Sequence, residues 1–291
     1  MNFLYFIYSK TIGRKKIIFR MIRFFIRNII NIYAPIYLFF SKNSLSKEIN
    51  VIVSLTSFPE RIDKVWIVIK SILNQTVTPK KIILTLSKPQ FDCKKLPNII
   101  LDFKNRGVLE IIWTNDDLRS HKKYYYVMKK YPNDIIVTID DDIIYENRLL
   151  EFLWKYHIKF PTCIIANNAC LRSGLDYSDW KNLNYKEHLP SNRIMPIGCG
   201  GVLYPPNSLP LEVFNKEKLK KCCPLADDIW LNSMTFLNKV KVVKTNYNMH
   251  YISISYSKRN NINLFEQNVF GDKNNQQLIC LRNEYDELKS F

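Results

Sequence analysis

Short apolar runs rich in β-branched residues alternate with helical patterns along most of the chain from residue 48 onward. Buried strands are predicted at 49–57, 79–87, 109–116 and 134–140. Helices are predicted between them, at 61–76 and at 120–132, where Pro132 ends the second one. Strand–helix–strand alternation at this spacing favours right-handed βαβ units with helices on both faces of the sheet. The pattern therefore predicts an α/β fold with a mostly parallel central sheet flanked by helices.

The first 47 residues follow a different pattern. Four cations spaced by four, three and four positions (Lys16, Arg20, Arg23 and Arg27) share one helical stripe, and apolar residues cover most of the remaining surface. The longest charge-free run, 28–41, has about 14 residues and contains Pro35, whereas a membrane span needs roughly 20. We expect residues 1–47 to form a basic amphipathic segment that lies in a membrane interface. The alternatives are a core helix of the main domain and a signal anchor.

Two further segments complete the expected organisation. Residues 48–257 are expected to form the main domain, and 258–291 an Asn-rich tail or lid without a clear period. Within the main domain, "LEFLWKYHIKFP" reads as a helix after the fourth strand, and "TCIIANNA" as a further strand. Of the seven cysteines, Cys222 and Cys223 are adjacent and the other five are scattered, with no CxxC pair, which favours a reducing, cytoplasmic compartment and reduced thiols over a zinc site.

The charge is concentrated at the N-terminus. The chain has 43 Lys and Arg against 26 Asp and Glu, a formal net charge of +17. Residues 1–47 contain no acidic residue and nine basic ones, which are Lys10, Arg14, Lys15, Lys16, Arg20, Arg23, Arg27, Lys42 and Lys47. Such a segment suits an anionic partner. The body has no basic-aromatic repeat, so we expect the cytoplasmic membrane surface, and no nucleic acid, as that partner.

Polar residues follow each of the four predicted strands of the main domain, at 56–61, 87–90, 115–117 and 140–142. Ligands of parallel sheets bind beyond the carboxyl ends of the strands, so these segments predict one crevice. The first strand is not followed by GxGxxG, and GxxxxGK[ST] does not occur in the sequence. A nucleotide bound here would need another clamp for its phosphates, and a divalent cation held by carboxylates would serve.

The run "IIVTIDDDIIY" gathers Asp140, Asp141 and Asp142 at the end of the fourth strand. In an extended chain Asp140 and Asp142 would point the same way and share a ligand, while Asp141 would face the scaffold. Without a cation, mutual repulsion would raise the pKa of the paired carboxyls. The alternative is a solvated acidic turn or a helix N-cap.

Several of these segments, in order, resemble the GT-A fold glycosyltransferases of bacterial cell-surface polysaccharide synthesis. The likeness covers roughly residues 50–250 and is carried by "SLTSFPERI", "NDDLRSHKKYYYVMKKYPNDIIVTIDDDIIY", "GCGGVLYPP" and "PLADDIWL". The resemblance implies a GT-A (Rossmann-like) fold and a UDP-sugar donor. It further implies that Asp142 ligates an Mn²⁺ or Mg²⁺ ion bridging the two phosphates, with Asp140 near the ribose or the metal.

The same resemblance implies roles for other donor-site residues. Thr56, Phe58 and Arg61 would lie near the base and ribose, Asp116 or Asp117 would contact the nucleotide, Lys123 would face its phosphates, and Asp141 belongs to the same donor-binding set. Two of these have plain structural alternatives: Arg61 as the cap of a helix turn, and Lys123 as a solvated helix lysine. His250 would complete the metal site or touch the diphosphate, although a lone histidine is more often structural.

The acceptor half is expected around Gly198, Gly200 and Gly201, which permit close approach of backbone to ligand unless they form a bulge between strands. In relatives an aromatic is expected where this chain has Cys199. Asp227 and Asp228 begin a predicted helix, where acids are favoured by the dipole alone. By the resemblance one of them is the general base, and we choose Asp228. Trp230 would floor the acceptor pocket or belong to the core.

These observations predict an inverting, metal-dependent glycosyltransferase at the inner face of the cell membrane. It would pass a sugar from a nucleotide-sugar donor to a surface glycan or a lipid-linked acceptor. Two alternatives of other classes stay open: a nucleotidyl- or phosphotransferase that uses the same acidic metal site, and a non-catalytic basic module that binds membrane or nucleic acid.

Overall fold

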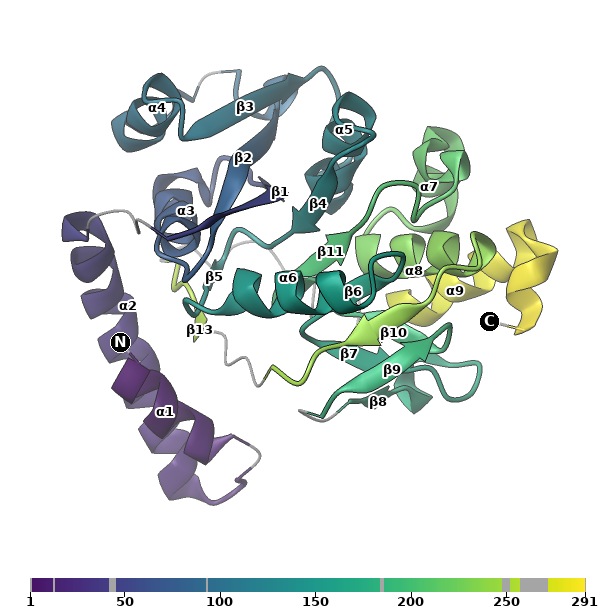
Figure 1. Cartoon of the computed structure of the whole chain (residues 1–291), viewed down its shortest axis with the longest axis horizontal. Helices are drawn as coiled ribbons and strands as arrows, with labels where there is room; N and C mark the ends of the chain where they lie inside the picture. The colour runs from purple at the N-terminus through teal and green to yellow at the C-terminus, as the bar shows by residue number, and fades with distance from the viewer. Residues whose placement is uncertain are drawn as a thin grey trace.

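An eight-stranded sheet runs through the centre of the molecule, in the strand order β3-β2-β1-β4-β11-β6-β12-β9 (Figure 1). The structure is a computed structural model that describes residues 2–12, 14–41, 46–92, 94–183, 186–247, 252–256 and 272–290. The strands of this sheet are β1 (Glu48–Thr56), β2 (Thr78–Ser87), β3 (Leu109–Thr114), β4 (Ile135–Thr138), β6 (Ile164–Ala166), β9 (His188–Ser191), β11 (Val202–Tyr204) and β12 (Val242–Lys244). The first four strands pair in parallel, whereas β11 is antiparallel to both β4 and β6. The predicted α/β class with a mostly parallel central sheet is confirmed.

Helices cover both faces of the parallel half. The helices α3 (Val65–Leu73), α4 (Asn98–Asn105), α5 (Lys122–Lys130) and α6 (Leu149–Lys159) follow β1, β2, β3 and β4 along the chain. Ile52 of β1 packs with Val127 of α5, while its neighbours Val51 and Val53 belong to the core cluster that contains α3. Because successive strand residues point to opposite faces, β1 needs apolar residues at both. This double burial explains its continuous apolar run.

The second half of the chain builds its own core beside the antiparallel strands. Its elements are β7 (Ala169–Leu171), β8 (Lys181–Asn182), β10 (Ile194–Pro196), α7 (Lys216–Cys222), α8 (Asp227–Leu237) and α9 (Lys273–Glu284). The strands β10, β7 and β8 form a three-stranded sheet. Leu278 and Leu281 of α9 are buried in this core, so part of the segment expected as a tail is packed helix. Residues 258–271 of that segment lie outside the described part of the chain.

The N-terminal segment forms a helical hairpin of α1 (Asn2–Thr11) and α2 (Ile17–Phe40) at one side of the molecule (Figure 1). Four residues of α2 at intervals of four, Ile26, Ile30, Ala34 and Leu38, are buried and join the main core. The helix is therefore amphipathic as predicted, and one side of it also serves as a core helix of the main domain. No helix among the described residues combines the length and the apolarity that crossing a membrane requires.

A two-stranded sheet links this hairpin region to the residues that follow β4. The strand β13 (Ile252–Ser253) pairs with β5 (Ile143–Ile144), and the Ile254 amide donates to the carbonyl of Asp142 at 2.7 Å. β4 itself ends at Thr138, two residues earlier than the predicted strand. Asp140, Asp141 and Asp142 consequently lie in a turn between β4 and β5, which we call the acid turn.

Candidate functional site

Lys123 is a buried lysine at the centre of the site. Helix α5 places its Nζ 2.9 Å from Oδ1 of Asp140 in the acid turn and 2.8 Å from Oδ2 of Asp227 in the first turn of α8. Burial lowers the pKa of the lysine, but the surrounding carboxylates of Asp140, Asp227 and Asp228 outweigh it and hold that pKa well above its ordinary value. Lys123 thus joins two acidic segments that lie almost ninety positions apart in the sequence, and solvation as an ordinary helix lysine does not describe it.

Asp227 and Asp228 are adjacent but differ in environment. Asp227 is buried against Lys123, which holds the pKa of Asp227 below its usual range despite the burial. Asp228 is half-buried, and its Oδ2 accepts a hydrogen bond of 3.0 Å from the Gly198 amide. Burial and the neighbouring Asp227 raise the pKa of Asp228 to about 7. One of the two carboxyls is therefore held ionised, and the other can exchange a proton near neutral pH.

The glycine-rich segment closes the site around these groups. A Cβ at Gly198 would lie 2.7 Å from Oδ1 of Asp228 and 3.1 Å from Nζ of Lys123. A Cβ at Gly200 would lie 2.7 Å from the backbone nitrogen of Asn168. These contacts explain why the first and third residues of "GCGG" have no side chain. The segment forms a short 3-10 turn, at 198–200, between β10 and β11.

We expect Gly198→Ala to displace the Asp228 carboxylate, because the added methyl group would overlap it. Misplacement of a reacting group by about 1 Å can cost up to about 10²-fold in rate. Turnover of the variant should therefore fall. Its thermal unfolding should change less than that of a variant without Lys123, because the Lys123 Nζ lies 3.1 Å from the added Cβ and has to shift only slightly. Full turnover in a folded Gly198→Ala protein would show that the position of Asp228 does not matter.

The acid turn is neutralised on its other side by Arg61. One nitrogen of the guanidinium, Nη1, lies 2.8 Å from Oδ1 of Asp141 and 2.9 Å from Oδ2 of Asp142. Ser57 donates to Oδ2 of Asp141 at 2.6 Å. Among the protein partners, Asp142 shares Arg61 with Asp141, and Asp140 pairs with Lys123, so the expected alternation of the three side chains is wrong. Alternation holds only in extended chain, and the three residues lie in a turn.

Aromatic rings enclose Arg61. Its guanidinium lies 5.2 Å from the ring centroid of Phe58 and 5.6 Å from that of Tyr256. Tyr256 also donates from its hydroxyl to the carbonyl of Asp141 at 3.4 Å. Ser57 and Tyr256 were not among the predicted site residues. Ser57 lies inside the predicted polar segment 56–61 and could have been included, whereas nothing near Tyr256 in the sequence links it to the acid turn.

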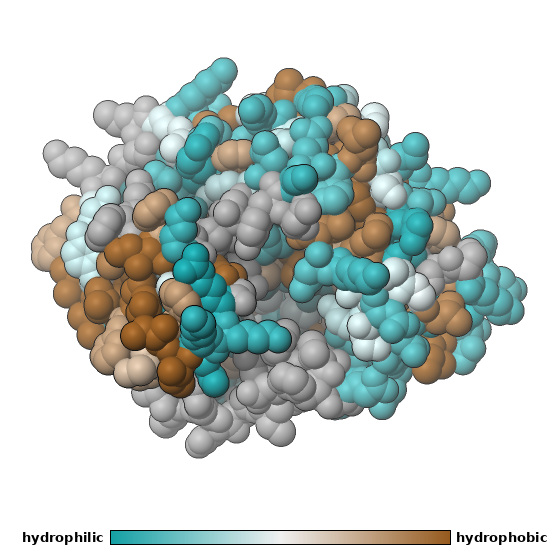
Figure 2. Space-filling view, turned by 90° about the horizontal axis from the view of Figure 1, so that it is seen from below, coloured by the Kyte–Doolittle hydropathy of each residue, from teal (hydrophilic) through white to brown (hydrophobic). Residues whose placement is uncertain are grey.

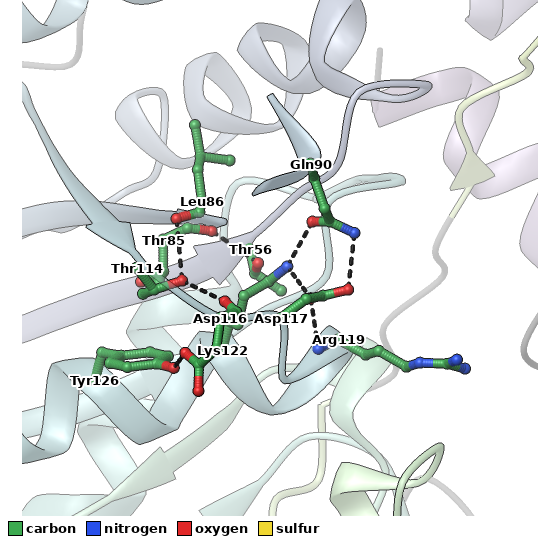
Figure 3. Close-up of polar contacts among 10 residues, drawn as sticks. All are labelled: Thr56, Thr85, Leu86, Gln90, Thr114, Asp116, Asp117, Arg119, Lys122 and Tyr126. Carbon is green, nitrogen blue, oxygen red and sulfur yellow. Dashed lines mark hydrogen bonds and ion pairs between the residues drawn. The ribbon is translucent and has the colours of Figure 1, made fainter. Parts of the chain in front are cut away.

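The ends of β1, β2 and β3 form a second polar cluster, drawn in Figure 3. Oδ1 of Asp117 accepts from Lys122 and its Oδ2 accepts from Gln90 at 2.8 Å, while the Thr56 hydroxyl donates to the carbonyl of Thr85 at 2.8 Å. Lys122 is 2% exposed, so this ion pair is largely withdrawn from solvent. Three of the four predicted polar strand ends meet here, with Lys122 as an additional member, and the fourth is the acid turn.

Asp116 faces away from that cluster. Its carboxylate pairs with Lys216 at 2.6 Å and accepts from the Tyr126 hydroxyl, as Figure 3 shows for Tyr126. Of the two adjacent acids considered for nucleotide contact, Asp117 therefore lies with the strand ends, and Asp116 is paired with other residues.

The structure also decides between the two roles expected for Trp230. This side chain is 0% exposed and donates from Nε1 to the carbonyl of Val213 at 3.1 Å. It belongs to the core and does not floor a pocket. His250 lies outside the described residues.

The site carries more negative than positive charge. Five carboxylates (Asp140, Asp141, Asp142, Asp227 and Asp228) lie around two cations, Lys123 and Arg61. Burial beside two other acids raises the pKa of Asp142 to about 6, although Arg61 opposes the shift. This raised pKa indicates that additional positive charge would be accommodated at the acid turn.

Hard carboxylate oxygens are the donors that Mg²⁺ and Mn²⁺ prefer, so the acid turn fits such an ion in chemistry. Within the described ranges, no three or more His, Cys, Asp or Glu side chains are grouped to hold a metal by themselves. Mg²⁺ is commonly bound by one or two carboxylates together with substrate phosphates and water. Asp140 and Asp142 are thus sufficient protein ligands only for a metal that arrives with a phosphorylated substrate.

Comparison with known proteins gives a likeness in fold. No protein-family model and no curated protein matches the chain. The structure of S. aureus TarS 1–349 in complex with UDP-GlcNAc is 11% identical, with a TM-score of 0.50 over 81% of this chain and 67% of TarS 1–349. TarS 1–349 in complex with UDP is also 11% identical, with a TM-score of 0.44 over 70% of this chain and 60% of that one.

Apo UDP-glucose pyrophosphorylase is 8% identical, with a TM-score of 0.42 over 71% of this chain and 92% of that protein. The chain spans 60% of the length of TarS 1–349 in a further structure of that protein. At these identities the likeness concerns the fold.

Proposed function

We propose that this protein is a metal-dependent glycosyltransferase that transfers a sugar from a nucleotide-sugar, of the UDP type, to an acceptor hydroxyl. The observation that carries the proposal is the meeting at Lys123 of the acid turn, helix α8 and the Gly198 segment. Ionised and titrating carboxylates lie there at the carboxyl end of a parallel sheet, where ligands of such sheets bind. The fold shared with TarS, whose structure holds UDP-GlcNAc, supports a nucleotide-sugar as donor.

In the proposed reaction Asp228 is the general base. Its carboxylate takes the proton from the acceptor hydroxyl while that oxygen attacks the anomeric carbon, and the nucleoside diphosphate leaves from the opposite face with inversion. Gly198 holds the carboxylate through its amide, and Lys123 keeps Asp227 ionised beside the developing positive charge of the sugar. Asp140 and Asp142 would hold Mn²⁺ or Mg²⁺, which when bound neutralises the diphosphate.

The donor nucleotide is assigned to the strand ends beside the acid turn. Thr56, Phe58 and Arg61 follow β1, and Asp117 follows β3. A guanidinium between two carboxylates and two rings can exchange an acidic partner for a phosphate oxygen without leaving its place. Asp141 holds Arg61 and Ser57 in that position and is a positioning residue in this scheme.

The acceptor is proposed to be a surface glycan or a lipid-linked glycan, at the inner face of the cell membrane. The concentration of basic residues in the first 47 positions and the exposed apolar side chains of α2 support a membrane location. An acceptor anchored in the same membrane would then reach the site without free diffusion.

The reaction is tested by incubating the purified protein with UDP-, GDP- and CMP-sugars and Mn²⁺ while free nucleotide is measured. Release of a nucleoside diphosphate that depends on an added acceptor is the expected result. Release of pyrophosphate from a nucleoside triphosphate and a sugar phosphate would instead identify a nucleotidyltransferase. Absence of turnover with every donor and acceptor glycan would contradict the proposal.

We expect Asp142→Asn to abolish turnover while the fold stays intact. Burial raises the pKa of Asp142 to about 6, so a neutral amide at this position relieves an unfavourable charge. Chelation of divalent cations should likewise remove activity, and added Mn²⁺ should restore it in the wild-type protein only. Turnover that chelation leaves undiminished, or full turnover in the variant, would exclude the metal role of the acid turn.

A further inference from the structure

Helix α2 exposes a continuous apolar stripe. Six side chains spaced by three or four positions lie along one side of the helix, and each is 48–78% exposed: Met21, Phe25, Ile29, Ile32, Ile36 and Phe40. We call this stripe the outer face of α2. Soluble monomers rarely expose contiguous apolar patches of this kind unless the patch binds a partner or a membrane.

The opposite side of the helix is already occupied. Ile26, Ile30, Ala34 and Leu38 are at most 6% exposed and pack into the main core. The outer face therefore cannot turn inward without emptying the core of these four side chains. Whatever covers it must come from outside the described part of the chain.

The surrounding charge indicates the kind of partner. Exposed cations lie on the other side of the N-terminal half of α2 and at the turn between α1 and α2, namely Lys10, Arg14, Lys15, Lys16, Arg20 and Arg27. Figure 2 looks at the molecule from below and shows a hydrophobic area bordered by hydrophilic residues on the side where the hairpin lies. A second copy docked through this helix would bring an N-terminal segment that is equally basic and has no acidic residue, so the pairing would gain no charge complementarity. An anionic surface with an apolar interior matches both features.

We propose that the outer face of α2 docks the protein onto an anionic lipid bilayer, with the helix lying in the plane of the membrane. The apolar stripe enters the boundary between headgroups and acyl chains, and the long basic side chains reach back to the headgroup phosphates. Arg23 donates to the carbonyls of Thr11 and Arg14 and so holds α1 against α2. The two helices of the hairpin would therefore dock as one unit.

The docked helix is fixed to the residues that follow the acid turn. Asn31 of α2 donates from Nδ2 to the Ser253 carbonyl at 3.1 Å and accepts from the Ser255 amide at 2.7 Å. Tyr5 of α1 donates to the Ile144 carbonyl at 2.8 Å. These hydrogen bonds fix both helices to the paired strands β5 and β13 and to the residues just after β13, where the Ile254 amide donates to the Asp142 carbonyl. Given the proposed function, docking would hold the donor site at a set height above the lipid that carries the acceptor.

The test uses the full chain, because removing the first 45 residues would strip Ile30 and Leu38 from the core. Binding is measured by sedimentation with vesicles of phosphatidylcholine, alone or mixed with phosphatidylglycerol. Wild-type protein should bind the mixed vesicles and release at high salt. The triple variant Phe25→Ser/Ile32→Ser/Phe40→Ser should bind them at least about tenfold more weakly. Its matched control is Leu189→Ser/Leu211→Ser, which removes side chains that are 70% and 89% exposed elsewhere.

Charge reversal separates the two parts of the surface. Arg20→Glu/Arg27→Glu should lose the preference for phosphatidylglycerol, again by about tenfold or more. Binding of both variants at the wild-type level would overturn the proposal. So would a wild-type dimer in vesicle-free solution, seen by light scattering, that the triple variant dissociates, since a second copy would then be the occupant. None of these measurements depends on sugar transfer, so failure of the proposed reaction would leave them intact.

Discussion

Replacement of Lys123 by methionine is expected to lower the free energy of unfolding by about 3–5 kcal/mol, the usual effect of removing one partner from a buried ion pair. Methionine fills a similar volume, so the loss comes from charge. Asp140 and Asp227 would each lose the Nζ that lies within 2.9 Å of them, and Asp228 would lose a nearby positive charge. Turnover should disappear as well, because the segments that meet at Lys123 would repel one another.

Thermal and denaturant unfolding measure the first effect, and a decrease of roughly 10 °C in Tm is expected for a chain of this size. Lys130→Met is the matched control on the same helix. Its side chain is 54% exposed and pairs with Glu110 at 2.7 Å, so the loss should stay below about 1 kcal/mol. Equal stability of the two variants would mean that Lys123 does not hold the acidic segments together.

Asp228→Asn is expected to reduce turnover by about 10²–10⁴-fold, the range that a positioned general base contributes. The amide oxygen can still accept the Gly198 hydrogen bond, so the geometry of the segment is retained. In the wild-type protein the base must be ionised, and its pKa is raised to about 7. Turnover should therefore rise with pH through about 7. A folded Asp228→Asn protein with undiminished turnover would exclude this residue as the base.

The same variant should gain stability at neutral and alkaline pH. A carboxyl whose pKa is higher in the folded state stabilises the fold while it is protonated, and this contribution is lost as pH rises from about 4 to about 7. Asparagine cannot ionise, so the variant avoids this loss. Its free energy of unfolding should exceed that of the wild-type protein by on the order of 1–3 kcal/mol above pH 7 and should equal it near pH 4.

Asp227→Asn is the control for the predicted gain in stability, because the opposite effect is expected at this neighbouring position. Lys123 lowers the pKa of Asp227, so its carboxylate stabilises the fold at neutral pH, and the amide should destabilise it. Unfolding measured between pH 4 and pH 8 compares the two variants. A destabilised Asp228→Asn protein at pH 8 would show that Asp228 is structural and is not held under electrostatic strain.

Local patterns in the sequence are enough to predict the parallel half of the molecule. The predicted strands at 49–57 and 79–87 correspond to β1 and β2 within one residue at each end. The reason is that strands buried on both faces need unbroken apolar runs, which are visible without tertiary information. Helix α9 had no such signal, since it has few apolar residues and buries only Leu278 and Leu281 among its apolar side chains. Its place depends on contacts with α7 and α8 that no local pattern encodes.

In the site, too, some features can be predicted from local sequence patterns and others depend on tertiary contacts. The four polar strand ends, the acidic residues and the glycine segment can be recognised from the sequence, because each has a chemical composition that core packing does not require. Which partner each carboxylate takes cannot be recognised in this way. Asp141 and Asp142 share Arg61 because β4 ends early and the acids lie in a turn, where the alternation of extended chain does not apply.

The sequence by itself therefore determined the α/β class, the polar residues at the strand ends, and the basic amphipathic character of the first 47 residues. Tertiary structure alone decided that Lys123 is the buried link between Asp140 and Asp227, that Trp230 belongs to the core, and that one side of α2 is core while the other is open. Periodicity and composition depend on neighbours in the chain, whereas the partner of a charge depends on which distant segment shares its low-dielectric surroundings.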